Sequence, residues 1–193
     1  MINLKINNVP VSVEPGTTIL QAAKSIGIKI PTLCYLKDIN EIGACRVCVV
    51  EVKGARNLVA SCVYPVNEGM EVFTNSERVL QARKTTIELL LSNHRKECLS
   101  CERNTNCELQ TLAYEYGCDA NKYAGAMCTE PQDFSTEYLI RDNTKCVLCR
   151  RCVAMCNKVQ KIGVLGASER GFDTHIGCAF DMNLVNMPCI GCG

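Results

Sequence analysis

Apolar and polar residues alternate at the start of the chain, which predicts a β-hairpin. The apolar side chains occupy every second position: Ile2, Leu4, Ile6, Val9, Val11 and Val13. Period-two alternation places one face of a strand against a core. Asn7 and Asn8 interrupt the alternation and favour a tight turn. Residues 2–13 are therefore predicted to form two antiparallel strands.

A short helix is predicted over residues 19–26. Thr18 followed three residues later by Gln21 is the pattern of a capping box at a helix start. Leu20, Ala23 and Ile26 then fall on one helical face, and Gly27 is a natural stop. Further strands are predicted at 47–52, 58–64 and 71–74. Strands combined with one helix in this order indicate an α+β module on a curled sheet.

Helical periodicity marks the middle of the chain. A helix is predicted from residue 75 or 76 to about 93, with its basic residues facing outward and a buried stripe of Leu80, Ile87, Leu90 and Leu91. A second, shorter helix is predicted at 108–120. Residues 121–140 read as a connection, and glycines divide 161–188 into short elements joined by turns.

Cysteine content changes the class of protein that these elements suggest. The chain has 16 cysteines among 193 residues, and its first residues lack the basic and apolar pattern of a signal peptide. We therefore expect a cytoplasmic protein with reduced thiols, for which dense cysteine indicates metal binding or redox chemistry. The net charge of +1 argues against nucleic acid as a partner. No apolar run approaches the roughly 20 residues of a membrane span.

The first cysteine group predicts a [2Fe–2S] site. It consists of Cys34, Cys45, Cys48 and Cys62, and four thiolates are the number that such a cluster needs. Gly43 and Ala44 allow the backbone to wrap closely before the paired cysteines. A zinc site on the same four thiols is the alternative, although zinc sites usually combine two close cysteine pairs and only one is present.

The second group mixes one imidazole with three thiols: His94, Cys98, Cys101 and Cys107. Zinc is a serious alternative on spacing alone. Because the other cysteine groups have the spacing of redox clusters, a [4Fe–4S] cluster with one histidine ligand is favoured over zinc. A neutral imidazole in place of a thiolate removes one negative charge, so this cluster should be easier to reduce and sensitive to pH.

The third group has the spacing of a bacterial ferredoxin. Its members are Cys146, Cys149, Cys152 and Cys156, with Asn157 where proline normally follows. Cys189 and Cys192 begin a partner run. We expect one [4Fe–4S] cluster on Cys146, Cys149 and Cys152 and another on Cys156, Cys189 and Cys192, each with its fourth ligand beyond residue 193. One cluster on the first four thiols, or zinc, is the alternative. The nearby Lys145, Arg150, Arg151, Lys158 and Lys161 form a solvated basic face, or offset cluster charge, or meet an acidic partner.

Three cysteines and one histidine stay outside these groups. Cys118, Cys128 and Cys178 are expected to be buried, inert thiols. His175 lies in a glycine-rich stretch, and we expect it to be solvated or to have a packing role.

Together these motifs resemble the N-terminal iron–sulfur region of [FeFe]-hydrogenase catalytic subunits of the NAD(P)-linked multisubunit type. The features shared are the spacing 34/45/48/62, the spacing 94/98/101/107, Arg141-Asp142 before the run 145–152, and the stretches 158–160, 170–174, 179–181 and 188–193. The large iron–sulfur subunit of complex I and NAD-linked formate dehydrogenases share the pattern less closely.

The resemblance implies a fold and a function. Residues 1–75 would form a β-grasp [2Fe–2S] domain, 76–137 a small helical His-ligated [4Fe–4S] domain, and 138–193 a two-[4Fe–4S] ferredoxin-like domain, incomplete at the C-terminus. These clusters would relay single electrons to an H-cluster in a further domain, so the 193 residues contain no catalytic residue of their own.

The implied partners are a flavin- and NAD(P)-binding iron–sulfur subunit, a thioredoxin-like [2Fe–2S] subunit and ferredoxin. The chain contains no nucleotide-binding fingerprint, so a pyridine nucleotide would bind to another subunit. The alternatives are the same relay in a formate dehydrogenase or complex I-type subunit and, from another class, a zinc-binding interaction protein.

Overall fold

A mixed five-stranded sheet forms the amino-terminal end of the computed structural model, which describes residues 1–123, 125–128 and 132–193. Its strands are β1 (Ile2–Ile6), β2 (Val9–Val13), β3 (Val49–Val52), β4 (Val59–Ala60) and β5 (Glu71–Phe73). They lie in the order β2-β1-β5-β3-β4, with β1 and β5 parallel and the other neighbours antiparallel. The predicted hairpin is confirmed, with Asn7 and Asn8 both at positive φ in its turn.

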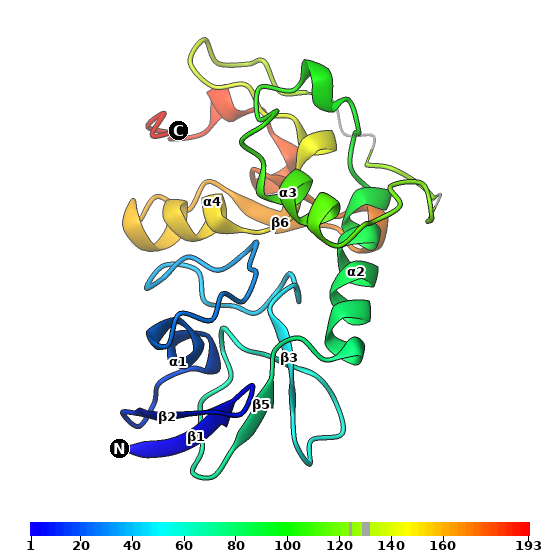
Figure 1. Ribbon diagram of the computed structural model, residues 1–193. Coiled ribbons are helices and arrows are strands. Elements are labelled where there is room, and N and C mark those ends of the chain that lie inside the picture. Colours follow the sequence, from blue (N-terminus) through cyan, green and yellow to red (C-terminus); the bar gives the residue numbers. More distant parts are fainter. Residues whose placement is uncertain (124, 129–131) are drawn as a thin grey trace.

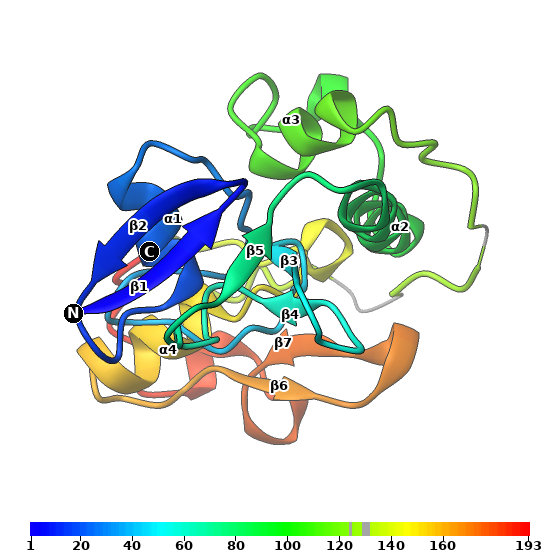
Figure 2. The same ribbon diagram turned by 60° about the horizontal axis from the view of Figure 1, so that its bottom comes forward.

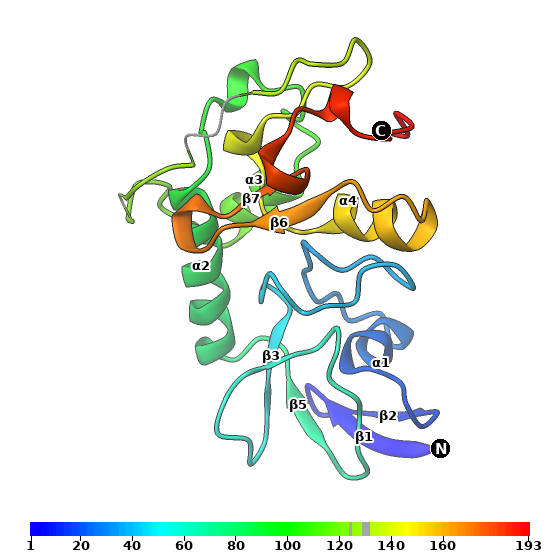
Figure 3. The same cartoon turned by 180° about the vertical axis from the view of Figure 1, so that it is seen from behind.

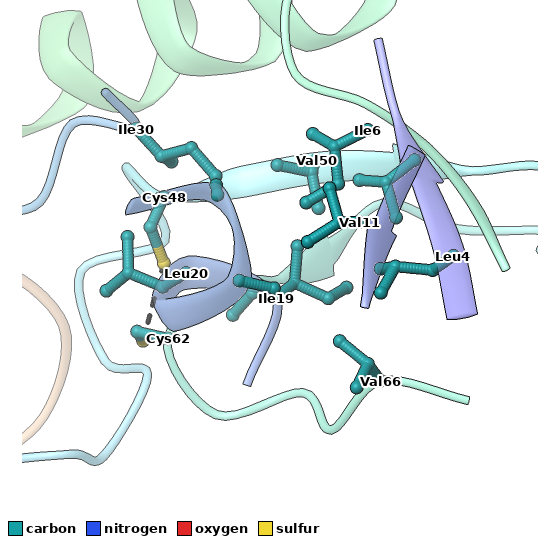
Figure 4. Close-up of a cluster of buried hydrophobic side chains, with 14 residues drawn as sticks. Leu4, Ile6, Val11, Ile19, Leu20, Ile30, Cys48, Val50, Cys62 and Val66 are labelled. Carbon is teal, nitrogen blue, oxygen red and sulfur yellow. Dashed lines mark hydrogen bonds between the residues drawn. The ribbon is translucent and has the colours of Figure 1, made fainter. Parts of the chain in front are cut away.

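Helix α1 (Ile19–Ser25) packs its apolar face on this sheet. Its capping box is present: the Thr18 hydroxyl accepts from the Gln21 amide, and the Gln21 side chain accepts from the Thr18 amide. The core between helix and sheet contains Ile6, Ile19 and Val50, all at 0% exposure. Figure 4 shows Cys48 and Cys62 at one end of this core, beside Leu20. Folding of the sheet module therefore places two cysteines in an apolar environment.

One predicted strand is much shorter than the sequence suggested. The pattern at 58–64 predicts seven residues, whereas β4 holds only two. The amides of Val63 and Tyr64 both donate to the carbonyl of Ala60, so the chain turns immediately after the strand. This turn carries Cys62 toward the other cysteines instead of along the sheet.

Helix α2 (Glu77–Ser92) runs from the sheet module to the second cysteine group, and α3 (Glu108–Glu115) packs beside its far half. The predicted burial of α2 is wrong in two places. Leu80 is exposed, and Arg83 is buried. The guanidinium of Arg83 donates to the carbonyl of Val49 at 2.8 Å and to the hydroxyl of Tyr116 at 3.2 Å. These hydrogen bonds compensate the burial of its charge and tie α2 to β3 and α3.

The carboxyl-terminal part consists of short elements, as the glycine pattern predicted. Helix α4 (Arg151–Ala154) continues into a π-helical turn at Met155–Val159, and β6 (Gly166–Ser168) pairs antiparallel with β7 (His175–Gly177). Single 3₁₀ turns complete the described chain: Cys98–Ser100, Asn143–Lys145, Gly171–Asp173, Ala179–Asp181 and Leu184–Asn186. A small core of Val164, Cys178 and Leu184 holds this part together.

The carboxyl-terminal part lies over the sheet module. Figures 1 and 3 show α4 and β6 lying across the middle, above the loop that follows α1. Figure 2 shows the β6–β7 hairpin and α3 on different sides of the sheet module. The predicted α+β class is confirmed. Among the described residues, no helix is both long enough and apolar enough to cross a membrane.

Candidate metal centres

The first cysteine group converges next to the apolar core. Cys34, Cys48 and Cys62 are each about 1% exposed, and Cys45 is half-buried. The Cys48 and Cys62 sulfurs lie 3.4 Å apart, drawn as a dashed line in Figure 4. The Cys45 amide donates to the Cys34 sulfur at 3.5 Å. The structure thus brings together all four thiols that the spacing predicts.

Hydrogen bonding shifts the pKa values of these four thiols in opposite directions within two pairs. Hydrogen bonding from Cys34 lowers the pKa of Cys45, and the same bond together with burial raises the pKa of Cys34. Hydrogen bonding from Cys62 lowers the pKa of Cys48, while the pKa of Cys62 rises. Four neighbouring thiolates repel one another, and a bound cation centre relieves that repulsion. Such a group is suited to a polynuclear metal cluster.

Left-handed residues recur inside the close cysteine pairs. Non-glycine residues rarely adopt positive φ, and each instance costs about 1–2 kcal/mol. Arg46 (φ 58°) lies between Cys45 and Cys48, and Leu148 (φ 53°) lies between Cys146 and Cys149. Arg150 (φ 59°) lies between Cys149 and Cys152, and Gly191 (φ 60°) lies between Cys189 and Cys192. Such backbone turns direct amides at sulfur, and the Leu148 amide donates to the Cys146 sulfur at 3.3 Å.

The second group lies around a cavity of about 450 Å³ whose lining includes His94, Cys101 and Cys107. Burial lowers the pKa of His94, with Asp142 opposing and Lys145 assisting this effect, so the imidazole is held in the neutral form that ligates metals. Within the described residues, the buried Nδ1 atom of His94 has no hydrogen-bond partner. A buried polar atom of this kind is costly unless something binds it.

Cys98 departs from its neighbours in this group. It is exposed, begins a 3₁₀ turn and does not line the cavity, although the Cys101 amide donates to its carbonyl at 3.2 Å. Cys107 caps the start of α3. The structure therefore brings three of the four predicted residues to the cavity and places the fourth on the adjoining turn.

The third and fourth groups are contiguous. Burial, with a smaller contribution from the nearby Cys152 and Cys149, raises the pKa of Cys146 to about 11. A second cavity, of about 330 Å³, is lined by Cys152, Cys156, Cys189 and Cys192. Backbone amides point at two of these sulfurs: that of Val164 at Cys156, 3.2 Å away, and that of Gly191 at Cys189, 3.5 Å away. Hydrogen bonds from amides to sulfur help to set the reduction potential of iron–sulfur clusters.

The spare cysteines are not equivalent. Cys128 and Cys178 are buried as expected, whereas Cys118 is half-buried with its thiol 3.8 Å from the carbonyl of Lys84. Cys128 lies close enough to Cys146 to help raise the pKa of its thiol. The cysteine spacing in the sequence did not indicate that these two residues are near each other. His175 is 3% exposed, and its Nε2 lies 2.8 Å from a carboxylate oxygen of Asp181. That position agrees with a packing role.

Arg151 connects the segments that carry the first, second and third cysteine groups. Its guanidinium donates to the Glu108 carboxylate at 3.0 Å and to the carbonyl of Tyr35 at 3.2 Å. Glu108 follows Cys107, Tyr35 follows Cys34, and Arg151 itself precedes Cys152. The sequence showed Arg151 only as one member of a basic run, because no spacing rule indicates which surface a charged side chain meets.

The donor sets fit iron–sulfur clusters. The first group presents sulfur pairs, and the other groups border cavities of several hundred Å³. Thiolates, a neutral imidazole and sulfur-directed amides are the ligand types of such clusters.

Two family comparisons define the class of protein. Residues 1–77 match the 2Fe-2S iron-sulfur cluster binding domain family. Residues 83–122 match the NADH-ubiquinone oxidoreductase-G iron-sulfur binding region. The chain thus matches one [2Fe–2S]-binding and one [4Fe–4S]-binding domain family.

Individual relatives extend the similarity over the whole chain. The chain is 48% identical to the NADP-reducing hydrogenase subunit HndD of Solidesulfovibrio fructosivorans, over 100% of its own length and 34% of the relative's. It is 34% identical to an NADH-quinone oxidoreductase subunit of Rhizobium meliloti (strain 1021), over 100% of its own length and 22% of that protein. The chain thus spans about a third or less of these curated relatives.

A solved structure supports the same grouping. A chain of NAD+-reducing [NiFe]-hydrogenase in the H2-reduced state superposes with a TM-score of 0.89 at 29% identity, covering 97% of this chain and 80% of that one. The resemblance inferred from the cysteine motifs is confirmed: the chain is similar throughout to iron–sulfur subunits of NAD(P)-linked hydrogenases and of complex I-type enzymes.

Proposed function

We propose that this chain is the iron–sulfur electron-relay segment of an [FeFe]-hydrogenase catalytic subunit. That subunit would oxidise H2 or reduce protons, coupled to NAD(P) or ferredoxin. The H-cluster and its catalytic residues would lie in a part of the enzyme outside these 193 residues. The higher identity to an NADP-reducing hydrogenase subunit, 48% against 34% for an NADH-quinone oxidoreductase subunit, supports a hydrogenase over the alternatives.

The observation that carries the relay function is the contact between the cysteine groups. Arg151 bonds to residues directly next to members of the first and second groups while adjoining a member of the third. A protein that binds clusters only for stability has no need to gather them in one interface. A protein that passes electrons needs its centres close together.

We assign the ligands as the spacing predicts. Cys34, Cys45, Cys48 and Cys62 would hold [2Fe–2S], and His94, Cys98, Cys101 and Cys107 would hold [4Fe–4S]. Cys146, Cys149 and Cys152 would hold a further [4Fe–4S], and Cys156, Cys189 and Cys192 another, each with its fourth ligand beyond residue 193. Movement of the exposed Cys98 toward the cavity would complete the second set.

When bound, these clusters supply one-electron transfer. The chain's residues bind them through thiolates, direct amides at the sulfurs and exclude water from the first site by burying three of its cysteines. Burial keeps the His94 imidazole neutral, so its cluster carries less negative charge. The basic Lys145 beside His94 acts in the same direction.

The proposed partners are other subunits of a cytoplasmic hydrogenase complex. A flavin- and NAD(P)-binding iron–sulfur subunit and a thioredoxin-like [2Fe–2S] subunit would exchange electrons with this chain, with ferredoxin as a further donor or acceptor. Similarity to chains of NADP- and NAD+-reducing hydrogenases supports this assembly.

The second candidate is the same relay in a complex I-type subunit. It is favoured by 37% identity to the NADH-ubiquinone oxidoreductase 75 kDa subunit of Reclinomonas americana, over 91% of this chain and 26% of the relative. The relay in a formate dehydrogenase has the same local chemistry and differs only in the catalytic domain.

The enzyme that contains this chain can distinguish these candidates. The intact complex, purified without oxygen, is assayed for H2-dependent reduction of NADP and NAD, and for NADH–quinone and formate activity. The proposal expects H2-dependent activity that Cys48→Ser reduces strongly, because that ligand is lost from the buried site. Quinone or formate activity without H2 uptake would instead establish one of the other candidates.

A further inference from the structure

Asn40 lies between two cysteine groups that are far apart in sequence. Its side-chain nitrogen donates to the carbonyl of Cys34 at 2.8 Å and to the carbonyl of Cys149 at 2.9 Å. Asn40 is only 2% exposed. One buried amide therefore joins a candidate ligand of the [2Fe–2S] site to a candidate ligand of the ferredoxin-like site.

The chemistry of the asparagine amide suits this position. A side-chain amide nitrogen has two hydrogens and can satisfy two carbonyl acceptors at once. The reverse orientation would set the Oδ1 atom against both carbonyls, so the hydrogen-bond partners determine which end faces them. An aspartate in this place would present acceptors to acceptors and bury a charge.

Backbone hydrogen bonds close the loop that carries Asn40. Asn40 and Leu36 exchange both backbone hydrogen bonds, at 2.8 and 3.1 Å, and close the loop after Cys34. The carboxyl-terminal part also fastens this loop from outside through Lys158, whose Nζ donates to the carbonyl of Ile39 at 2.8 Å. Arg151 provides the third attachment at Tyr35.

We propose that Asn40 is a positioning residue that sets the rate of direct electron exchange between the [2Fe–2S] site and the Cys146–Cys149–Cys152 site. The inference rests on the proposed relay function. In each exchange one electron would pass from the reduced cluster to the oxidised cluster, with no bond formed or broken and no proton transferred. The path would run from the Cys34 thiolate through its own backbone, across the two hydrogen bonds of the Asn40 amide, to the backbone and thiolate of Cys149.

Two consequences distinguish a role in electron exchange from a purely structural role, in which Asn40 would only hold the two segments together. Tunnelling falls steeply with the distance between centres and with gaps in the bonded path, so losing the amide slows exchange even when both clusters are present. The two hydrogen bonds also polarise the peptide groups of ligating cysteines, and hydrogen bonding around a cluster changes its reduction potential.

The test uses the full holoprotein with Asn40→Leu, which keeps the approximate volume and removes both donors. Iron content is measured first. Electron exchange between the two clusters is then followed by rapid freeze-quench EPR after partial reduction, and their magnetic interaction is measured in the fully reduced protein. We expect unchanged iron, exchange slowed about tenfold or more, in line with losses of hydrogen-bond partners around metal ligands, and a weaker magnetic interaction.

Lys158→Met is the matched control. It removes a hydrogen bond between the same two segments, yet the bond is exposed and ends on Ile39, which is not a ligand. We expect this variant to lose some stability and keep the wild-type exchange rate. Asn40→Ser, a smaller change, serves if the leucine variant does not fold, and we expect slowed exchange there too.

A wild-type exchange rate and magnetic interaction in either iron-loaded Asn40 variant would overturn the proposal. Equal slowing in Lys158→Met would also overturn it, because general loosening of the interface would then explain the effect. Wild-type protein that holds both clusters and exchanges no electron between them would refute the proposed relay itself.

Discussion

At the residue scale, cysteine spacing predicted which thiols lie near one another but not the backbone conformation between them. Spacing identifies sulfur donors because cluster geometry restricts how few residues can separate two ligands. It does not reveal the left-handed conformation of Arg46, Leu148 and Arg150, since these residue types carry no sign of it. Nor does it reveal Asn40, whose partner is 109 positions away.

The left-handed residue after Cys149 gives a stability prediction. Arg150 has φ 59° and an exposed side chain. Arg150→Gly relieves about 1–2 kcal/mol of backbone strain against a comparable entropy cost, so unfolding free energy should change by less than about 1 kcal/mol. Arg150→Val should destabilise by about 1–3 kcal/mol, because a β-branched side chain is worse at positive φ. Chemical denaturation followed by cluster absorbance measures both; equal effects of the two substitutions would contradict the strain argument.

His94 gives a redox prediction. His94→Cys adds a negative charge to the cluster of the second group, so its reduction potential should become more negative and its dependence on pH should disappear. Redox titration monitored by EPR measures the change. His175→Gln is the control, because His175 is buried against Asp181 rather than at the cavity. A potential in His94→Cys equal to that of wild type would exclude His94 as a ligand.

At the element scale, local signals succeeded and burial of polar residues was missed. The capping box at Thr18, the Asn7-Asn8 turn and the start of α2 near residue 76 follow from short-range chemistry and are confirmed. Periodicity assigns charged residues to solvent, so it placed Arg83 on the wrong side of α2. Partners from distant segments, here Val49 and Tyr116, make its burial favourable.

Glu88 on the same helix gives a pH prediction. Its carboxylate is buried, accepts from Lys122 at 2.8 Å and from the Asp119 amide at 3.3 Å, and its pKa is lowered chiefly by the Lys122 bond. A lowered pKa in the folded state stabilises the protein above the ordinary glutamate value of about 4.3, and this stabilisation is lost as pH falls through the folded-state pKa.

Glu88→Gln should therefore lower the thermal midpoint at pH 7, and the difference from wild type should shrink only as pH falls below the ordinary glutamate value of about 4.3 and through the lower folded-state pKa. Thermal unfolding followed by circular dichroism across this range measures both effects. Glu115→Gln is the control, since Glu115 is exposed and forms none of these bonds. A difference that stays constant from pH 7 to well below the ordinary glutamate pKa of about 4.3 would show that ionisation of Glu88 does not contribute.

At the scale of the whole molecule, similarity and geometry lead to the same function by separate routes. The chain aligns along its full length with a hydrogenase subunit and a quinone oxidoreductase subunit. Independently, its cysteine groups meet at an interface held by Asn40 and Arg151. Sequence reasoning reached the order of the cysteine groups but not their contact, because the contact depends on packing between segments 43 to 116 residues apart.

The central claim is that this chain holds a series of iron–sulfur clusters that exchange electrons. The most direct measurement is iron and zinc analysis of the anaerobically purified protein, combined with Mössbauer spectroscopy and EPR during stepwise reduction. The account predicts about six irons per chain from one [2Fe–2S] and one [4Fe–4S] cluster, and about eight more where the ferredoxin-like pair is complete. It also predicts distinct reduced signals for each cluster. A colourless protein with stoichiometric zinc and no reducible signal would contradict it.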